Sequence, residues 1–192
     1  EIITLSKPEI KINEVIKFIK KEVKCGNQIF WVCPLIKESK KLDYEAAVKK
    51  FEYLNVLFEN KVGLIFGSLD KEQKEIVLKK FLNKSIQILV STTVIEVGID
   101  FPNANVIVIE NSNKFGLSQL HQLRGRVGRS SKQGTCILLY KENLSEKAKK
   151  RITILKSTND GFKIAEEDMK LRGFGDILGY QQSGIKEFRL AD

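Results

Sequence analysis

Five short apolar segments divide the sequence, and each has the pattern of a strand covered on both faces. Their apolar residues are nearly continuous, whereas a strand with one solvent-exposed face would alternate apolar and polar positions. Helical periodicity lies between several of them, so the order predicts right-handed βαβ units and a mostly parallel sheet of the α/β class. The five segments are Ile29–Cys33, Val62–Phe66, Ile86–Val90, Val106–Ile109 and Cys136–Tyr140.

Three amphipathic segments are expected to form helices around this sheet. Residues 12–23 place apolar side chains at helical spacing, and Gly26 would end that helix. Residues 47–58 carry a second apolar stripe, and Asp70, three residues before Gln73, has the spacing of a capping box. These patterns support alternating strands and helices over the first two thirds of the chain.

The pattern changes after the last apolar segment. Ser145 can cap a helix, and Asp160-Gly161 then supplies a turn. The spacing of Phe162, Ala165 and Met169 predicts a second short helix whose apolar face would be formed by these side chains. We therefore expect a helical hairpin, followed by a glycine-rich, extended tail.

Composition indicates a folded protein rather than a disordered or membrane chain. The 192 residues are 42% hydrophobic and 30% charged, enough for one sizeable core. No apolar run approaches the roughly 18 residues of a membrane span, so no membrane partner and a cytoplasmic location are expected. Because Glu1 stands where an initiator Met would be, we expect a piece of a longer chain.

The cysteines and the single histidine offer little chemistry. Three cysteines without C-x-x-C spacing predict buried structural thiols in a reducing compartment. With His121 as the sole histidine, neither a metal site nor a catalytic cysteine is expected. We interpret His121 as a packing or capping residue and Trp31 as part of the core.

Positive charge collects in the C-terminal part of the chain. Residues 1–110 hold 17 basic and 15 acidic groups, whereas residues 111–192 hold 16 and 9. This imbalance favours a polyanionic partner, although a solubilising surface would also explain it. Only six residues are Arg against 27 Lys, yet three of the six fall within Leu123–Arg129, which suggests a need for planar, always-charged groups.

The segment Gln122–Arg129 is the first candidate for chemistry. Arg126 and Arg129 are three residues apart, so on a helix they would project from one face toward a triphosphate. Gly125 and Gly128 would let a phosphate or a second lobe approach closely. The alternative is that the arginines pair with surface carboxylates. No G-x-x-x-x-G-K-[ST] sequence occurs, so the chain alone is not expected to hydrolyse ATP.

The segment Ser91–Asp100 is the second candidate. It follows a predicted strand, and ligands of open parallel sheets bind beyond the carboxyl ends of the strands. Small hydroxyls there can donate to phosphates, and Asp100 can accept a hydrogen bond from a ribose. The alternative is a structural loop.

Together these two segments resemble motifs V and VI of superfamily 2 helicases. Val106–Tyr140 resembles more specifically the RecG family of bacterial branch-migration helicases, and so does Gln28–Ile36. The resemblance extends from about Gln28 to the end of the chain and is weak over residues 1–25.

The C-terminal part adds a second resemblance. Ile164–Gly173 and Gln181–Gly184 resemble the translocation motif that the RecG and Mfd families share. Ile109-Glu110-Asn111 and residues 187–192 favour RecG over Mfd. Phe66 departs from the RecG pattern, in which His usually precedes Gly, and this puts any polar role there in doubt.

The resemblance implies a RecA-like, three-layer α/β/α helicase lobe over residues 1–142 and a translocation hairpin with its loop over 143–192. The implied function is the C-terminal motor lobe of an ATP-dependent translocase that acts on branched or duplex DNA. ATP and Mg²⁺ would be bound mainly by an N-terminal RecA-like lobe, and a wedge domain would belong to the same full-length chain. An Mfd-type lobe and a non-catalytic nucleic-acid-binding module are the alternatives.

The resemblance also implies roles for single residues. Arg126 and Arg129 would be catalytic arginine fingers that reach the γ-phosphate. The other implied residues are Gly98, Asp100, Gln122 and Gly125 for ATP binding, Thr92 and Thr93 for DNA binding, and Arg151, Arg172 and Gln182 for coupling hydrolysis to translocation.

Overall fold

The computed structural model describes residues 2–34, 39–92, 104–128, 133–141 and 143–173. Strands and helices alternate, as the apolar pattern predicts. The strands are β1 (Ile2–Pro8), β2 (Gln28–Cys33), β3 (Val62–Ile65), β4 (Ile88–Thr92), β5 (Ala104–Ile109) and β6 (Gly134–Tyr140). The α-helices are α1 (Ile12–Lys24), α2 (Lys40–Leu57), α3 (Lys71–Leu82), α4 (Leu117–Arg124), α5 (Glu146–Ser157) and a helix over residues 161–173, with short 3-10 helices η1 (Glu9–Lys11) and η2 (Ser112–Lys114).

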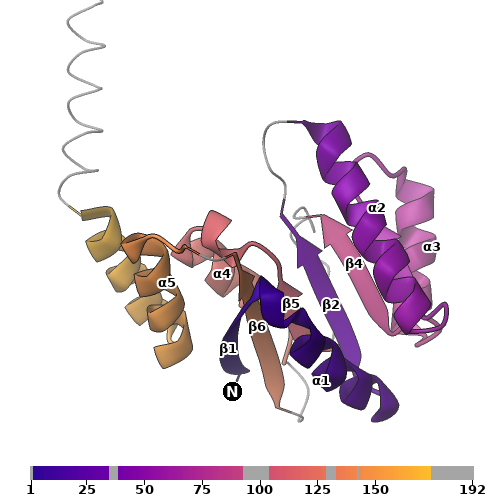
Figure 1. Ribbon diagram of the computed structural model, residues 1–192, viewed down its shortest axis with the longest axis horizontal. Coiled ribbons are helices and arrows are strands. Elements are labelled where there is room, and N and C mark those ends of the chain that lie inside the picture. Colours follow the sequence, from indigo (N-terminus) through magenta and orange to yellow (C-terminus); the bar gives the residue numbers. More distant parts are fainter. Residues whose placement is uncertain (1, 35–38, 93–103, 129–132, 142, 174–192) are drawn as a thin grey trace, which may run out of the picture.

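The strands form one sheet in the order β1-β6-β5-β2-β4-β3, and every pair in it is parallel (Figure 1). Alternate strand residues enter two separate cores. One core packs the sheet against α1 and α2, and the other packs it against α3, α4 and α5. The predicted three-layer α/β/α fold is therefore confirmed. Trp31, which is fully buried in β2, is part of the first core.

Strand β1 was missed by the apolar pattern. It pairs with β6 along its whole length at the edge of the sheet, with Leu5 opposite Ile137. Ile3 and Leu5 remain 44% and 40% exposed, so this strand lacks the continuous apolar run that marks the buried strands. Residues 2–8 thus complete the lobe.

Strand β4 extends two residues beyond the predicted end. Ser91 pairs with Ile65 of β3, and Thr92 pairs with Cys33 of β2. Both side chains are buried, and the Ser91 hydroxyl donates to the Thr92 carbonyl at 2.7 Å. The interpretation of these two residues as part of a loop was wrong, because their small side chains fit a buried strand.

The predicted second helix of the hairpin exists, but its predicted apolar face was wrong. Phe162 and Met169 are 91% and 65% exposed. The helix packs instead through Ile164, which is buried, and Leu171, which lies against the same core. Helical spacing located the helix, whereas the inward face was set by contacts with α4 and α5.

The cysteines differ in burial. Cys33 and Cys136 are buried, and desolvation raises the pKa of the Cys136 thiol to about 12. Cys25 is exposed at the end of α1, so the prediction of three buried thiols was wrong for this residue. It lies beside Gly26, whose φ of 81° lets the chain leave the helix, as predicted. Within the described residues, no helix has the length and apolar character needed to cross a membrane.

Candidate functional site

Helix α4 leads directly into the predicted arginine pair. Gly116 occupies its N-cap, where the Gln119 side chain accepts a hydrogen bond from the Gly116 N–H at 2.9 Å. The helix ends at Arg124, and the Gly125 N–H donates to the His121 carbonyl. Arg126 therefore lies in a turn after the helix rather than on it, and its alignment with Arg129 stays a prediction. Arg129 itself lies outside the described residues.

The two glycines of this segment play different structural roles. A Cβ on Gly125 would lie 3.5 Å from its nearest neighbours, an ordinary contact, so the fold of this lobe does not require glycine there. Gly128 has a φ of 78°, and a Cβ would lie 3.0 Å from Ile2 and 3.3 Å from the Gly134 backbone. Gly128 thus serves the fold, whereas Gly125 leaves space toward the outside.

Three of the predicted ATP-site residues lie within one short stretch. Gln122 on the last turn of α4 is exposed, Gly125 is exposed, and Arg126 is partly exposed. Val127 is buried, and the Gly128 N–H donates to the Ala104 carbonyl, which holds this stretch against β5. Gly98 and Asp100 lie outside the described residues.

Thr92, the first of the two predicted DNA-contacting residues, is the last residue of β4. Thr92 is only 3% exposed, and Thr93 lies outside the described residues. The carboxyl end of β4 faces the edge of the sheet where ligands of such folds bind. The DNA roles of both residues stay predictions.

Arg124 anchors α4 from inside the lobe. Its side chain is 1% exposed. The guanidinium donates to the Thr4 hydroxyl of β1 at 3.1 Å and to the Leu155 carbonyl of α5. Burial lowers its pKa, but an arginine remains protonated at neutral pH. Sequence reasoning did not single out Arg124. The signal that could have found it is the choice of arginine in a chain that otherwise uses lysine.

His121 forms part of the same anchor. Its Nδ1 lies 3.0 Å from the Arg124 guanidinium, which can only donate, so Nδ1 accepts and the imidazole is neutral. Desolvation and then the positive charge of Arg124 lower the His121 pKa. The interpretation of His121 as a packing residue agrees with this geometry.

The predicted coupling residues Arg151 and Arg172 lie on the two helices of the hairpin. Arg151 contacts the segment before α4 directly, whereas Arg172 pairs with Asp168 of its own helix. Arg151 on α5 donates to the Asn113 carbonyl in η2 at 3.1 Å. Arg172 lies 3.4 Å from Asp168, which accepts a hydrogen bond from the Ser118 hydroxyl of α4 at 3.0 Å. Arg151, Asp168 and Arg172 line a small cavity of about 180 Å³.

The geometry therefore links the hairpin to α4 at several points, and α4 continues into the arginine-bearing turn.

Sequence reasoning missed Ser118, Asn113 and Asp168, although Asp168 lies inside the segment that resembles the translocation motif. Gln182 lies outside the described residues. In the described part of the chain, no three His, Cys, Asp or Glu side chains are grouped so as to hold a metal ion.

Residues 10–131 match the helicase conserved C-terminal domain, and the chain belongs to this family. Residues 158–192 match the C-terminal part of domain 3 of the ATP-dependent DNA helicase RecG. The predicted resemblance to the RecG family is thus confirmed by a family model for the C-terminal part of the chain.

Curated relatives support the same assignment. The ATP-dependent DNA helicase RecG of Bacillus subtilis is 48% identical over 94% of this chain and 27% of its own length. RecG of Thermotoga maritima is 48% identical over 100% of this chain and 25% of its own length. The alignment to the Thermotoga relative also extends over residues 1–25, where the sequence resemblance is expected to be weak. The chain spans about a quarter of the length of these relatives.

Solved structures resemble the fold. A structure of RecG bound to a three-way DNA junction superposes with a TM-score of 0.77 at 46% identity, over 92% of this chain and 23% of that chain. The yeast DEAD-box splicing factor Prp28 superposes with a TM-score of 0.63 at 20% identity, over 83% of this chain and 33% of that chain. The second likeness concerns the fold alone.

Proposed function

We propose that the chain is the C-terminal motor lobe of an ATP-dependent DNA translocase that acts on branched DNA, as in fork reversal and branch migration. The observation that carries this proposal is the joint match to the helicase C-terminal domain and to RecG domain 3. The RecG relatives are named ATP-dependent DNA helicases, and one RecG structure holds a three-way junction.

In this proposal the turn after α4 completes an ATP site whose other half lies on a second lobe. Arg126 and Arg129 would donate hydrogen bonds to the γ-phosphate when the lobes close, with Gly125 leaving room for that approach. Gln122 on the neighbouring helical turn, with Gly98 and Asp100, would border the nucleotide. Mg²⁺ would neutralise phosphate charge and be held mainly by the other lobe, which would also carry the P-loop that this sequence lacks.

The same turn would transmit the nucleotide state to DNA. Arg151, Arg172 and Gln182 would belong to the hairpin and its loop. Arg151 contacts Asn113 just before α4, and Arg172 pairs with Asp168, which accepts a hydrogen bond from Ser118 of α4. Movement of α4 on lobe closure would therefore shift the hairpin. Thr92 and Thr93 would contact DNA phosphates, which suits a motor that must move along any sequence.

Activity of the lobe alone and of the full-length protein tests this proposal. We expect the 192-residue chain to show no ATP hydrolysis, and the full-length protein that contains it to hydrolyse ATP faster when forked DNA is added. Unwinding of a model fork would distinguish a RecG-type function from an Mfd-type function, which would instead displace a stalled RNA polymerase. A full-length protein that binds DNA without hydrolysing ATP would favour the non-catalytic module and refute the proposal.

A further inference from the structure

A groove separates α5 from the edge of the sheet. Its volume is about 800 Å³, and its lining includes Ser6 of β1, Tyr140 at the end of β6, and Lys149, Thr153 and Lys156 of α5. None of the described residues that line it is acidic. Because all strands are parallel, the groove lies toward the same edge of the sheet as the end of β4.

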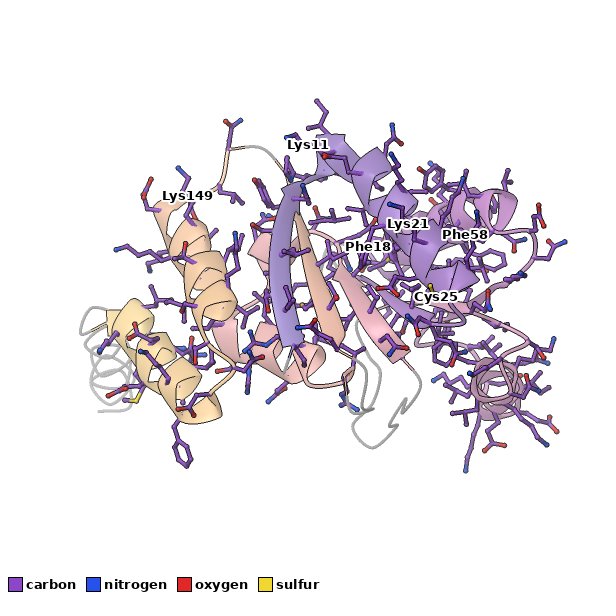
Figure 2. All side chains as sticks on the ribbon, turned by 90° about the horizontal axis from the view of Figure 1, so that it is seen from below. Lys11, Phe18, Lys21, Cys25, Phe58 and Lys149 are labelled. Atoms are coloured by element: carbon purple, nitrogen blue, oxygen red, sulfur yellow. The ribbon has the colours of Figure 1, made fainter. Side chains whose placement is uncertain are left out.

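Helix α5 presents an unusual concentration of positive charge beside this groove. Its 12 residues include five Lys or Arg and one Glu. Lys149, Thr153 and Lys156 have the spacing i, i+4, i+7 and lie on one exposed face, here called the α5 stripe. A neighbouring groove of about 430 Å³ shares Lys149 and Thr153, so the stripe borders both grooves. Figure 2 shows Lys149 near the beginning of α5, on the opposite side of the molecule from Cys25 and Phe58.

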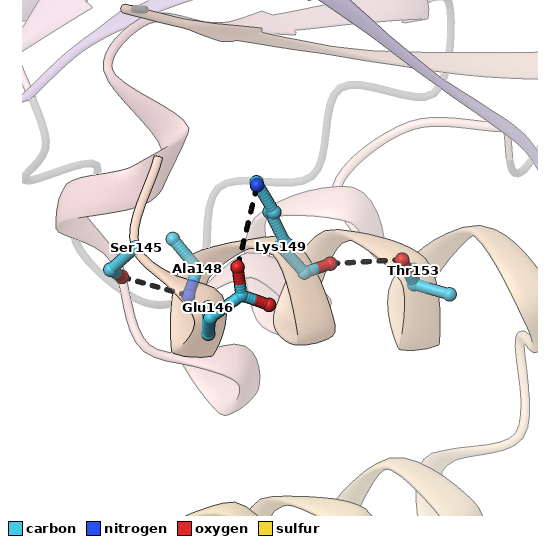
Figure 3. Close-up of polar contacts among 5 residues, drawn as sticks. All are labelled: Ser145, Glu146, Ala148, Lys149 and Thr153. Atoms are coloured by element: carbon cyan, nitrogen blue, oxygen red, sulfur yellow. Dashed lines mark hydrogen bonds and ion pairs between the residues drawn. The ribbon is translucent and has the colours of Figure 1, made fainter. Parts of the chain in front are cut away.

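The groove has hydrogen-bond donors that suit an anion. The Lys156 ammonium donates to the Ser6 hydroxyl at 3.3 Å, and Ser6 accepts that bond, so its own proton can donate to a ligand. Lys149 lies 3.5 Å from Glu146 (Figure 3), but both side chains are more than half exposed and such a pair is weak. The Thr153 hydroxyl donates to the Lys149 carbonyl at 2.9 Å, so the ammonium groups and Ser6 are the donors for a ligand.

The stripe is rigid because the opposite face of α5 is packed. Ala148, Ile152 and Leu155 are buried, and the Ser145 hydroxyl accepts a hydrogen bond from the Ala148 N–H at 3.1 Å (Figure 3). The two stripe lysines are seven positions apart, about 10 Å along the helix. That length corresponds to about three base-pair steps of roughly 3.4 Å along duplex DNA.

We infer that the α5 stripe and the groove beside it bind the phosphate backbone of duplex DNA and track it during translocation. This inference rests on the proposed function and adds a DNA-contacting surface on the first helix of the hairpin. The groove is open along one side, which fits a continuous backbone better than an enclosed nucleotide. Contacts of this kind are independent of sequence and depend strongly on salt.

Binding of a blunt duplex of mixed sequence to the full-length protein tests the inference. Fluorescence anisotropy without ATP, at several KCl concentrations, gives the slope of log Kobs against log[KCl]. The double variant Lys149→Gln/Lys156→Gln should lower the magnitude of that slope by about 1.8, since each lost phosphate contact contributes about 0.9. Lys149→Arg/Lys156→Arg should retain the wild-type slope, because both charges are kept.

A charge-matched control is available on α3. Lys79 and Lys80 are exposed near the end of α3, at the amino edge of the sheet, so Lys79→Gln/Lys80→Gln should leave the slope unchanged. Thermal unfolding of all variants checks the fold. If the wild type binds duplex and hydrolyses ATP but the stripe variant keeps the wild-type slope, the groove inference alone is overturned. A wild type that binds no duplex and hydrolyses no ATP would overturn both this inference and the proposed function.

Discussion

Single residues around α4 have roles that their type alone does not reveal. Three arginines fall within Leu123–Arg129. Of these, Arg124 is buried and joins β1 to α5, whereas Arg126 lies in a partly exposed turn. The two glycines divide in the same way, since Gly128 has a left-handed backbone and Gly125 does not. Sequence motifs therefore single out this segment as a whole but do not separate its buried structural residues from its partly exposed ones.

The histidine of this anchor makes stability depend on pH. The His121 pKa is lowered from 6.5 in the folded state, so the unfolded chain binds more protons as pH falls below about 6.5. The contribution of neutral His121 is therefore fully present above that pH and is lost as pH falls toward its folded pKa. Thermal unfolding between pH 7.5 and 5.5 should show a smaller decrease in Tm for His121→Gln than for the wild type.

His121 is the only histidine, so this comparison isolates one group. The titration of its imidazole signals by NMR gives the folded pKa independently. A folded pKa at or above 6.5, or an equal decrease in Tm for both proteins, would contradict the geometry in which Nδ1 accepts from Arg124.

At the scale of elements, the hairpin and α4 behave as connected parts. Ser118 of α4 donates to Asp168 of the second hairpin helix, and Arg151 of α5 donates to the carbonyl of Asn113 just before α4. A shift of α4 would therefore be passed to both hairpin helices. Arg124 of α4 also donates hydrogen bonds to the Thr4 hydroxyl of β1 and to the Leu155 carbonyl of α5, so α4 is connected to these two elements as well.

We predict that Asp168→Asn uncouples hydrolysis from movement. The variant weakens the contacts to Ser118 and Arg172 but leaves the turn after α4 intact, so DNA-stimulated ATP hydrolysis should persist. Fork unwinding should fall by about two- to thirty-fold, the range expected for a coupling energy of roughly 0.5–2 kcal/mol. Parallel measurement of hydrolysis and unwinding in the full-length protein gives the ratio directly.

The adjacent carboxylate supplies a matched control. Glu167 pairs with Lys170 on its own helix at 3.5 Å, so Glu167→Gln should change neither rate. If Asp168→Asn lowered hydrolysis and unwinding equally, the role of this contact as a link between them would be refuted.

The elements also show how far the sequence predicts the fold. Strands buried on both faces were found because their apolar runs are continuous, and Ser145 and Asp70 mark helix starts where both side chains do cap. Strand β1 was missed because one side of an edge strand is exposed to solvent, so it needs no continuous apolar run. The inward face of residues 161–173 was misassigned because it is set partly by Asp168, a polar residue that contacts Ser118. Such long-range polar contacts leave no periodic signal.

At the scale of the whole molecule, the described residues form one layered fold, whereas the proposed ATP site would need residues of another lobe. Six parallel strands and their helices form two continuous cores, and β1 closes the sheet edge. The sequence has no P-loop, and the candidate site consists of a short stretch that includes Gln122, Gly125 and Arg126. The candidate site was predictable from motif spacing, whereas the anchor of Arg124 and His121 beneath it required the three-dimensional arrangement.

In the proposed function, the turn after α4 supplies arginines to an ATP site shared with another lobe. The most direct measurement is the rate of DNA-stimulated ATP hydrolysis by the full-length protein with Arg126→Ala or Arg129→Ala, with Lys79→Ala as a control and DNA affinity measured in parallel. We predict a loss of about 10³–10⁵ in rate for an arginine finger, with DNA affinity within a few-fold and the control unchanged. Hydrolysis within a few-fold of the wild type in both arginine variants would contradict the claim.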